Sequence, residues 1–387
     1  MRVVKVVKQN YLPTEETLEL LEDFRLMVND CIRIGLKKNI TSMRKLCLAS
    51  YRALAEYQTA TYYRLTATSR AAGILRNYRK SLDKNLRTKG PHAKKLMLTD
   101  CYGFRIQGDR LRLTLRAHEY VYIELNPHTL AALQGCTARS VTLTPMALSI
   151  AYAREVEEVA LKGMIGIDRN LDNISIASSD AKIQRFDLSK ATLIKKSYRE
   201  IKSHLKRNDV RIRRRVFSKY GALQRSRVGW ILNNCSSAIV RQAREKRFGI
   251  AMEDLRGLRK LYRKGNGQGR NYRARLSSWS YYELRRQIEY KARWEGIPVV
   301  YVPARGTSVT CSTCGSRTYP NEQRGVHCPK CRTTVDRDVN AARNISAKGA
   351  LRFSANGPPG EAMVAEREKS NATQIRPVDG GKSVHAR

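Results

Sequence analysis

The amino-acid sequence predicts an α+β protein built from several domains, and three observations carry this prediction. The chain has 387 residues, of which 42% are hydrophobic, so it can bury two or three separate cores. Apolar residues recur at helical spacing between residues 15 and 95, whereas residues 110–116 alternate between apolar and polar. Beyond Gly163, short apolar strands alternate with helical segments, as is typical of an α/β sheet.

The N-terminal part is predicted to be a small antiparallel β-barrel or sheet that is interrupted by a helical domain. Residues 1–10 begin with a Val-rich strand, and residues 96–160 contain further strand-like segments, so these two stretches are assigned to the barrel. Residues 11–95 are predicted to be helical and include Thr14, an N-cap residue followed by two acids. Tyrosines stand among the basic residues of this block, where they either stack on bases or fill a helical core.

The C-terminal part is predicted to be an α/β domain of residues 161–304 and 336–352. Its strands are expected at residues 164–168, 173–178, 183–186, 248–253 and 297–302. Its helices are expected at residues 190–227, 228–239, 284–292 and 336–345. Residues 263–278 are rich in Gly, Arg, Asn and Ser and are predicted to be a mobile basic loop. Residues 353–387 are predicted to be a disordered tail.

The charge of the chain predicts a polyanionic partner. Lys and Arg number 74 against 34 Asp and Glu, which gives a formal net charge of +40. Such a charge disfavours compaction, and bound nucleic acid offsets this cost because its phosphates release condensed counterions. A soluble protein that is merely basic is the alternative. No segment approaches the ~20 apolar residues of a spanning helix, and no signal-peptide core follows Met1, so no membrane association is expected.

The basic segment of residues 190–227 is the candidate contact to nucleic acid. Arg211 and Arg215 are four residues apart, so on an α-helix they would form one phosphate-facing ridge. A solvated helical face that binds nothing specific is the alternative. The predicted nucleic-acid-binding residues are Arg211, Arg213, Arg214, Arg215 and Arg305.

Four of the nine cysteines predict a structural zinc site in residues 305–335. They form two pairs, Cys311-x2-Cys314 and Cys328-x2-Cys331, which are separated by thirteen residues. Four thiolates suit tetrahedral Zn²⁺, and a site that the protein closes with four ligands is structural rather than catalytic. His327 lies beside Cys328 and is an alternative ligand. A basic chain without a signal segment is expected in a reducing compartment, where such pairs bind metal more often than they form disulfides.

Three acids are predicted to meet at one edge of the α/β sheet. Asp168 and Glu253 end predicted strands, and Asp338 begins a predicted helix. This order of elements is that of an RNase H-like sheet, in which three such acids converge. Converging carboxylates repel one another unless cations neutralise them, and hard oxygen ligands select Mg²⁺ or Mn²⁺. Two such ions can hydrolyse a phosphodiester bond.

The same segments resemble a known family. In combination, residues 166–168, 252–255, 305–315, 328–331 and 336–345 are similar to TnpB, the transposon-encoded OrfB proteins related to type V CRISPR effectors. The resemblance covers roughly residues 100–350. It implies a RuvC-like, Mg-dependent DNA endonuclease with an inserted zinc ribbon, and a wedge barrel interrupted by a helical recognition domain. It further implies a guide RNA and a target DNA as partners, and a place in the cytoplasm of a prokaryote at the nucleoid.

By their place in the motifs, Asp168, Glu253 and Asp338 are the catalytic acids that the resemblance implies. Asp336 is less favoured as the third acid, because the Asp-x-Asn-Ala-Ala pattern selects Asp338. The family often has Gly where this chain has Asn170, and Asn tolerates left-handed backbone geometry, so the site is expected to survive. A non-cleaving RNA-guided repressor and a transposase with strand-transfer activity are the alternatives. The oligomeric state is left open, with a monomer as one option.

Overall fold

The computed structural model describes residues 1–86, 88–205, 208–258, 267–322 and 324–356; for residues 213, 355 and 356 it describes the backbone alone. The described residues form two compact units, one of residues 2–155 and one of Met1 with residues 156–356. None of the described helices is apolar over a length that could cross a bilayer.

The unit of residues 2–155 contains seven strands and a group of helices. Its first sheet has the order β1-β7-β6-β2 and consists of β1 (Arg2–Asn10), β2 (Leu98–Asp100), β6 (Thr137–Thr144) and β7 (Ala147–Glu155). Its second sheet has the order β3-β4-β5 and consists of β3 (Phe104–Gln107), β4 (Arg110–Arg116) and β5 (Glu119–Glu124). The strands that were predicted to form an antiparallel barrel or sheet thus belong to two antiparallel sheets. The pairing of β1 with β7 confirms that the first strand joins strands far along the chain.

Most helices of this unit lie between β1 and β2, and one short helix lies between β5 and β6. They are α1 (Glu15–Lys37), α2 (Met43–Ser50), η1 (Ala53–Glu56), α3 (Thr61–Leu82) and α4 (Pro127–Leu133). The predicted N-cap of α1 is confirmed, because the Thr14 side chain accepts a hydrogen bond from the Thr17 backbone N–H. Leu21, Phe24 and Val28 are fully buried on one side of α1, which explains the helical spacing of apolar residues in this block.

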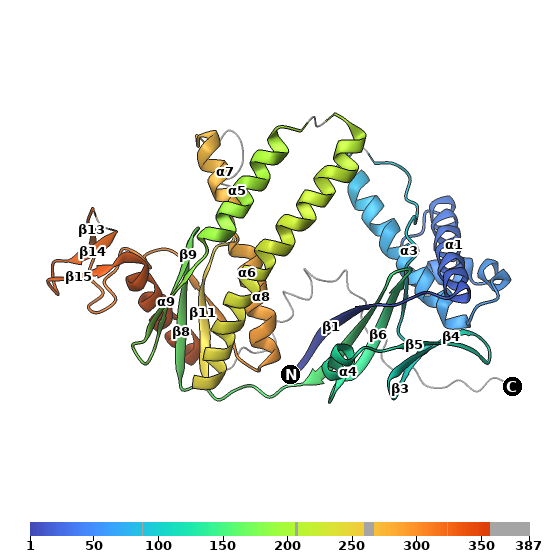
Figure 1. Cartoon of the computed structure of the whole chain (residues 1–387), viewed down its shortest axis with the longest axis horizontal. Helices are drawn as coiled ribbons and strands as arrows, with labels where there is room; N and C mark the ends of the chain where they lie inside the picture. The colour runs from blue at the N-terminus through green and yellow to red at the C-terminus, as the bar shows by residue number, and fades with distance from the viewer. Residues whose placement is uncertain (87, 206–207, 259–266, 323, 357–387) are drawn as a thin grey trace. The chain divides into compact units, whose positions relative to one another are not determined.

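The second unit is built on a five-stranded sheet with the order β10-β9-β8-β11-β12 (Figure 1). Its strands are β8 (Gly163–Arg169), β9 (Asn173–Ser178), β10 (Ile183–Asp187), β11 (Phe248–Asp254) and β12 (Val299–Pro303). The pairs β10–β9 and β9–β8 are antiparallel, whereas β8–β11 and β11–β12 are parallel. As a consequence, β8 and β11 end side by side at the same edge.

Helices cover both faces of this sheet (Figure 1). They are α5 (Ser189–Ser203), the π-helical segment η2 (Ile212–Val216), α6 (Phe217–Lys246), α7 (Arg270–Ser278), α8 (Tyr281–Trp294) and α9 (Arg337–Asn356). On one face Ile165 and Ile167 pack with Leu232 and Leu284 of α6 and α8. On the other face Met164, Ala251 and Val302 pack with Ile345 of α9. Each fully buried Ile or Leu contributes roughly 1.5–3 kcal/mol, so both layers stabilise the sheet.

The alternation of side chains along β8 determines on which face of the sheet Asp168 lies. Successive strand residues point to opposite faces, so Met164, Gly166 and Asp168 share the face that α9 covers. Gly166 lies directly under α9: a Cβ there would overlap the backbone of Ala342 and Ser346. The absence of a side chain at Gly166 thus lets α9 approach the sheet beside Asp168.

A small three-stranded sheet precedes α9. It has the order β13-β14-β15 and consists of β13 (Tyr319–Pro320), β14 (Gly325–Cys328) and β15 (Thr333–Asp336).

Two predictions about irregular segments need correction. Residues 270–278 of the predicted loop 263–278 form α7, a helix made mostly of Arg, Asn and Ser. Residues 259–266 lie outside the described residues. The predicted tail begins too early, because α9 continues to Asn356. Residues 357–387 of that tail lie outside the described residues.

Candidate active site and metal centre

Asp168 and Glu253 lie side by side at the ends of two parallel strands. Ile167 of β8 pairs with Met252 of β11, so the next residue on each strand is an acid that faces the α9 side of the sheet. Asp168 is only 8% exposed. Burial, and then the nearby charges of Glu253 and Asp338, raise the pKa of Asp168 to about 7.

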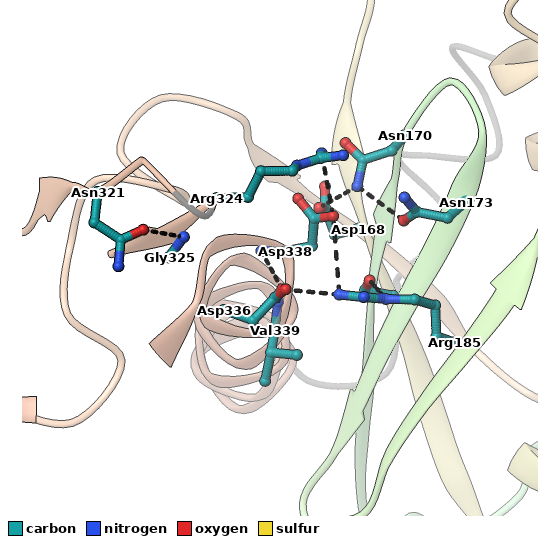
Figure 2. Close-up of polar contacts among 11 residues, drawn as sticks. Asp168, Asn170, Asn173, Arg185, Asn321, Arg324, Gly325, Asp336, Asp338 and Val339 are labelled. Carbon is teal, nitrogen blue, oxygen red and sulfur yellow. Dashed lines mark hydrogen bonds and ion pairs between the residues drawn. The ribbon is translucent and has the colours of Figure 1, made fainter. Parts of the chain in front are cut away.

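Asp338 reaches the same place from the first turn of α9. It is buried, and Figure 2 shows its carboxylate beside that of Asp168. The three acids therefore come together from β8, β11 and α9. Asp336 plays a different part, because its carboxylate accepts hydrogen bonds from the backbone N–H groups of Asp338 and Val339 and so caps α9.

Each acid is oriented by a neighbouring side chain. The Asn170 amide donates to Asp168 at 3.0 Å, and the Thr307 hydroxyl donates to Glu253 at 2.6 Å. Arg324 forms an ion pair with Asp338 at 3.4 Å. In the part of the chain that the structure describes, the carboxylate oxygens of the three acids do not all lie within 4.8 Å of one another. Oxygen donors of this kind nevertheless suit hard divalent cations, which would offset the repulsion between the acids.

Asn170 does not use the left-handed backbone geometry that was expected to replace Gly. It is absent from the described residues with positive φ, and its backbone N–H donates to the Asn173 carbonyl at 2.9 Å. Its side chain donates both to Asp168 and to the Asn173 side chain (Figure 2). Asn at this position therefore adds a polar contact to the site.

Arg169 secures the ends of the strands from the opposite face. It is 2% exposed, and its guanidinium donates to the backbone carbonyls of Glu253 and Tyr281. A buried guanidinium is costly unless it is hydrogen-bonded, so these contacts hold the end of β11 and the start of α8 close to β8.

Two asparagines of α9 tie the helix to the loop that follows β12. Asn344 donates to the backbone carbonyls of Thr307 and Thr310, and Asn340 donates to Thr310 and accepts from the Ser312 N–H. Thr307 in turn contacts Glu253. Sequence reasoning named none of Thr307, Asn340 and Asn344 as functional, although all three lie inside the quoted motifs.

The four paired cysteines form a cluster that could hold a metal ion. The Sγ atoms of Cys311, Cys314, Cys328 and Cys331 all lie within 4.8 Å of one another. Two of the separations are 3.5 Å (Cys314–Cys328) and 4.0 Å (Cys311–Cys331). A tetrahedral Zn–S distance of about 2.3 Å requires sulfur atoms about 3.8 Å apart, so the donor set fits a zinc ion. All nine cysteines are free thiols.

The environment of this cluster favours a bound cation. Hydrogen bonds from Ser316 lower the pKa of Cys314 to about 6, whereas hydrogen bonding to Cys314 and its neighbours raises the pKa of Cys331 to about 12. Four thiolates this close together repel one another, and a bound cation would offset this repulsion. His327 is exposed and its ring nitrogen Nδ1 lies 3.2 Å from the Thr334 hydroxyl, so it is not part of the cluster.

The predicted nucleic-acid-binding arginines lie elsewhere on this unit. Arg211, Arg214 and Arg215 are exposed at the start of η2 and α6, while the side chain of Arg213 lies outside the described residues. Residues 212–216 are π-helical, so Arg211 and Arg215 lie on a wider turn than that of an α-helix. Arg305 is exposed, and its carbonyl accepts a hydrogen bond from Lys348.

Comparison with known proteins identifies related sequences. Residues 281–345 match the family described as Cas12f1-like, TNB domain. The chain is 26% identical over 261 residues to a TnpB-like protein of Methanocaldococcus jannaschii, covering 63% of this chain and 92% of that protein. It is 36% identical over 99 residues to the CRISPR-associated endodeoxyribonuclease Cas12f1 of Sulfoacidibacillus thermotolerans. That match covers 25% of this chain and only 21% of Cas12f1.

Two solved structures share the fold. One is a complex of Cas12f1 with sgRNA and target DNA, with a TM-score of 0.55 and 15% identity, covering 86% of this chain and 81% of that one. The other is the mini-RNA-guided endonuclease CRISPR-Cas_phi3, with a TM-score of 0.51 and 12% identity, covering 90% of this chain and 92% of that one. The predicted multidomain α+β class is therefore confirmed. In sequence the chain is thus similar to TnpB-like and Cas12f proteins, and in fold it is similar to Cas12f1 and CRISPR-Cas_phi3.

Proposed function

We propose that this protein is an RNA-guided DNA endonuclease that hydrolyses phosphodiester bonds at Asp168, Glu253 and Asp338. The observation that carries the proposal is the meeting of these three acids at one sheet edge, from β8, β11 and α9. The strand order β10-β9-β8-β11-β12 is the one expected of an RNase H-like, RuvC-type domain. The names of relatives, such as the endodeoxyribonuclease Cas12f1, support the same reaction.

The chemistry assigns a role to each side chain. Bound at the acids, two Mg²⁺ or Mn²⁺ ions would activate a water molecule and stabilise the leaving oxygen of the phosphodiester. Asp168, Glu253 and Asp338 would hold these ions with their carboxylate oxygens. Asn170 and Thr307 orient two of the carboxylates. Arg324, next to Asp338, would carry a positive charge toward the phosphate.

The cysteine cluster would hold one structural Zn²⁺ within a zinc ribbon of residues 305–335. The separations of the Sγ atoms support this assignment. A three-stranded sheet of this size has little core of its own, so the ion would supply much of its folding energy. Elemental analysis of freshly purified protein should find about one zinc per chain, and folded protein without zinc would refute the assignment.

A guide RNA and a target DNA would be the partners. The net charge of +40 supports a large phosphate-bearing ligand, and the exposed Arg211, Arg214, Arg215 and Arg305 are candidate contacts. Base pairing to the guide would select the target, and the protein would recognise the geometry of the heteroduplex. A transposon is the proposed origin of the gene.

The test is cleavage by protein that is purified with its own RNA. Wild-type complex should cut matched DNA in Mg²⁺, whereas Asp168→Ala should lose cleavage and keep its affinity for RNA and DNA. Full cleavage by Asp168→Ala would remove Asp168 from the catalytic set. Tight binding by the wild type without any cleavage would favour a repressor, and joined DNA products would favour a transposase.

A further inference from the structure

The edge strand β10 carries an arginine that points at the start of α9. Arg185 forms an ion pair with Asp336 at 2.8 Å and lies 4.0 Å from the carboxylate of Asp338. Figure 2 shows Arg185 reaching from the sheet to both acids, while Arg324 approaches Asp338 from another direction. The side chain of Arg185 therefore connects the sheet edge with the helix that carries the third acid.

Arg185 is itself anchored to the row of residues that contains Asp168. Across the sheet, Asp168 pairs with Ser175 of β9, and Ser175 pairs with Arg185 of β10. The Arg185 Nε donates to the Ser175 hydroxyl at 3.3 Å, and Ser175 is fully buried. The guanidinium group of Arg185 is thus tethered to the strand that pairs with Asp168.

Asp336 passes this constraint on to Asp338. One oxygen of its carboxylate, Oδ1, accepts from Arg185 and from the backbone N–H groups of Asp338 and Val339. These bonds satisfy two of the free N–H groups at the start of α9. A shift of Asp336 relative to β10 would consequently move the first turn of α9, and the carboxylate of Asp338 with it.

We propose that Arg185 and Asp336 are positioning residues, which hold Asp338 at the distance from Asp168 that divalent-metal binding requires. The inference rests on the proposed function, since it assumes that the acids bind metal. Arg185 and Asp336 are 47% and 40% exposed, and an ion pair of this exposure contributes little to stability. The geometry therefore serves the placement of α9 more than the stability of the fold.

Arg185→Gln separates a positioning role from a purely electrostatic effect, because the two predict opposite changes in the affinity for Mn²⁺. Removing a positive charge near carboxylates would by itself strengthen their affinity for a cation. If Arg185 positions Asp338, the variant should instead bind Mn²⁺ about tenfold more weakly, which corresponds to about 1.4 kcal/mol. Free Mn²⁺ can be followed by its EPR signal in the RNA-bound protein, with the Mg²⁺ dependence of cleavage as the second readout.

Further variants sharpen the test. Asp336→Asn keeps an N-cap side chain but loses the ion pair, so it should also bind Mn²⁺ more weakly. Arg185→Lys keeps the charge with poorer geometry, so its Mn²⁺ affinity should lie between those of the wild type and Arg185→Gln. The double variant Arg185→Gln/Asp336→Asn should be no worse than the more impaired single variant, since both changes remove one interaction. Arg244→Gln breaks an ion pair with Glu295 at 2.7 Å in the same unit and should leave Mn²⁺ binding unchanged.

The outcomes distinguish the two hypotheses. Unchanged or tighter Mn²⁺ binding by Arg185→Gln, with Asp338→Asn inactive, would overturn the positioning role and leave the proposed function standing. The positioning role would also be overturned if the Tm of Arg185→Gln fell so far that unfolding at the assay temperature explained the weaker Mn²⁺ binding. Full cleavage and Mn²⁺ binding by Asp338→Asn would overturn the proposed function, and the positioning role with it.

Discussion

At the scale of single residues, the surroundings of Asp168 make protons and metal ions compete for one carboxylate. Burial and two neighbouring acids raise its pKa from 3.8 to about 7. The folded protein therefore keeps a proton on Asp168 that the unfolded chain has already lost between pH 4 and 7. A divalent cation would remove this preference, because it stabilises the charged form.

The stability of the metal-free protein should therefore fall as the pH rises. Without metal, the stability contributed by Asp168 is present at about pH 4 and is lost as the pH rises through 7, because the unfolded state binds fewer protons there. Mn²⁺ affinity should rise over the same interval and level off above pH 8. The Tm of metal-free wild type should thus fall relative to Asp168→Asn between pH 5 and 8. A constant difference in Tm between the two proteins would contradict the raised pKa.

Thr307 offers a second test at this scale. Its hydroxyl donates to Glu253 at 2.6 Å, and a hydrogen bond to a charged group contributes about 1.5–3 kcal/mol. Thr307→Val has almost the same shape without this donor, so cleavage should fall by roughly ten- to a hundredfold. Thr307→Ser keeps the hydroxyl and should remain close to wild type in the same single-turnover assay. Equal rates for the Val and Ser variants would mean that Glu253 does not need this bond.

At the scale of elements, the contact between α9 and the sheet decides whether the three acids meet. Asp168 and Glu253 belong to neighbouring strands, but Asp338 arrives on a helix that crosses β8 at Gly166. Loop residues between β12 and the cysteine cluster are bonded to the same helix through Asn340 and Asn344. The position of α9 thus links the sheet, the loop and the cysteine cluster.

Gly166→Ala tests this contact directly. The added Cβ would overlap the α9 backbone, which cannot give way as a flexible side chain can. Overpacking of this kind costs about 1–3 kcal/mol in unfolding free energy, measurable in urea, and should also reduce cleavage by moving Asp338. Gly229→Ala is the control, because a Cβ there meets nothing within 4 Å on α6 and should stabilise that helix slightly. Equal stability of Gly166→Ala and wild type would show that α9 can shift freely.

At the scale of the whole molecule, the 387 residues carry a formal net charge of +40. Self-repulsion of this size opposes folding, and a bound polyanion relieves it. Salt dependence of RNA binding measures how many phosphates the chain neutralises.

The segment at the start of α6 is the part of this surface to change first. Replacing Arg211, Arg214 and Arg215 with Gln should weaken RNA binding and flatten its log–log salt slope by roughly one unit for each lost phosphate contact. Fluorescence anisotropy with the chain's own RNA at several salt concentrations provides the measurement. Unchanged affinity and slope would locate the RNA elsewhere. Arg244→Gln, near the C-terminal end of α6, serves as a comparison in which one positive charge is lost far from this segment.

Local patterns in the sequence determined much of this protein by themselves. The strands that end at Asp168 and Glu253, the helix that begins near Asp338 and the pairing of the four cysteines follow from periodicity and spacing over a few residues. The predicted loop over residues 270–278 was wrong, because a helix made mostly of polar residues leaves a weak local signal.

Only the tertiary structure decided which side chains serve the acids. Thr307 meets Glu253 across 54 positions of the chain, and Arg185 meets Asp336 across 151. Such contacts depend on strand register and on the approach of α9 over Gly166, which no periodicity encodes. The sequence could name Asp336 as a second candidate acid, but its role as the cap of α9 and the partner of Arg185 required both elements to be in place.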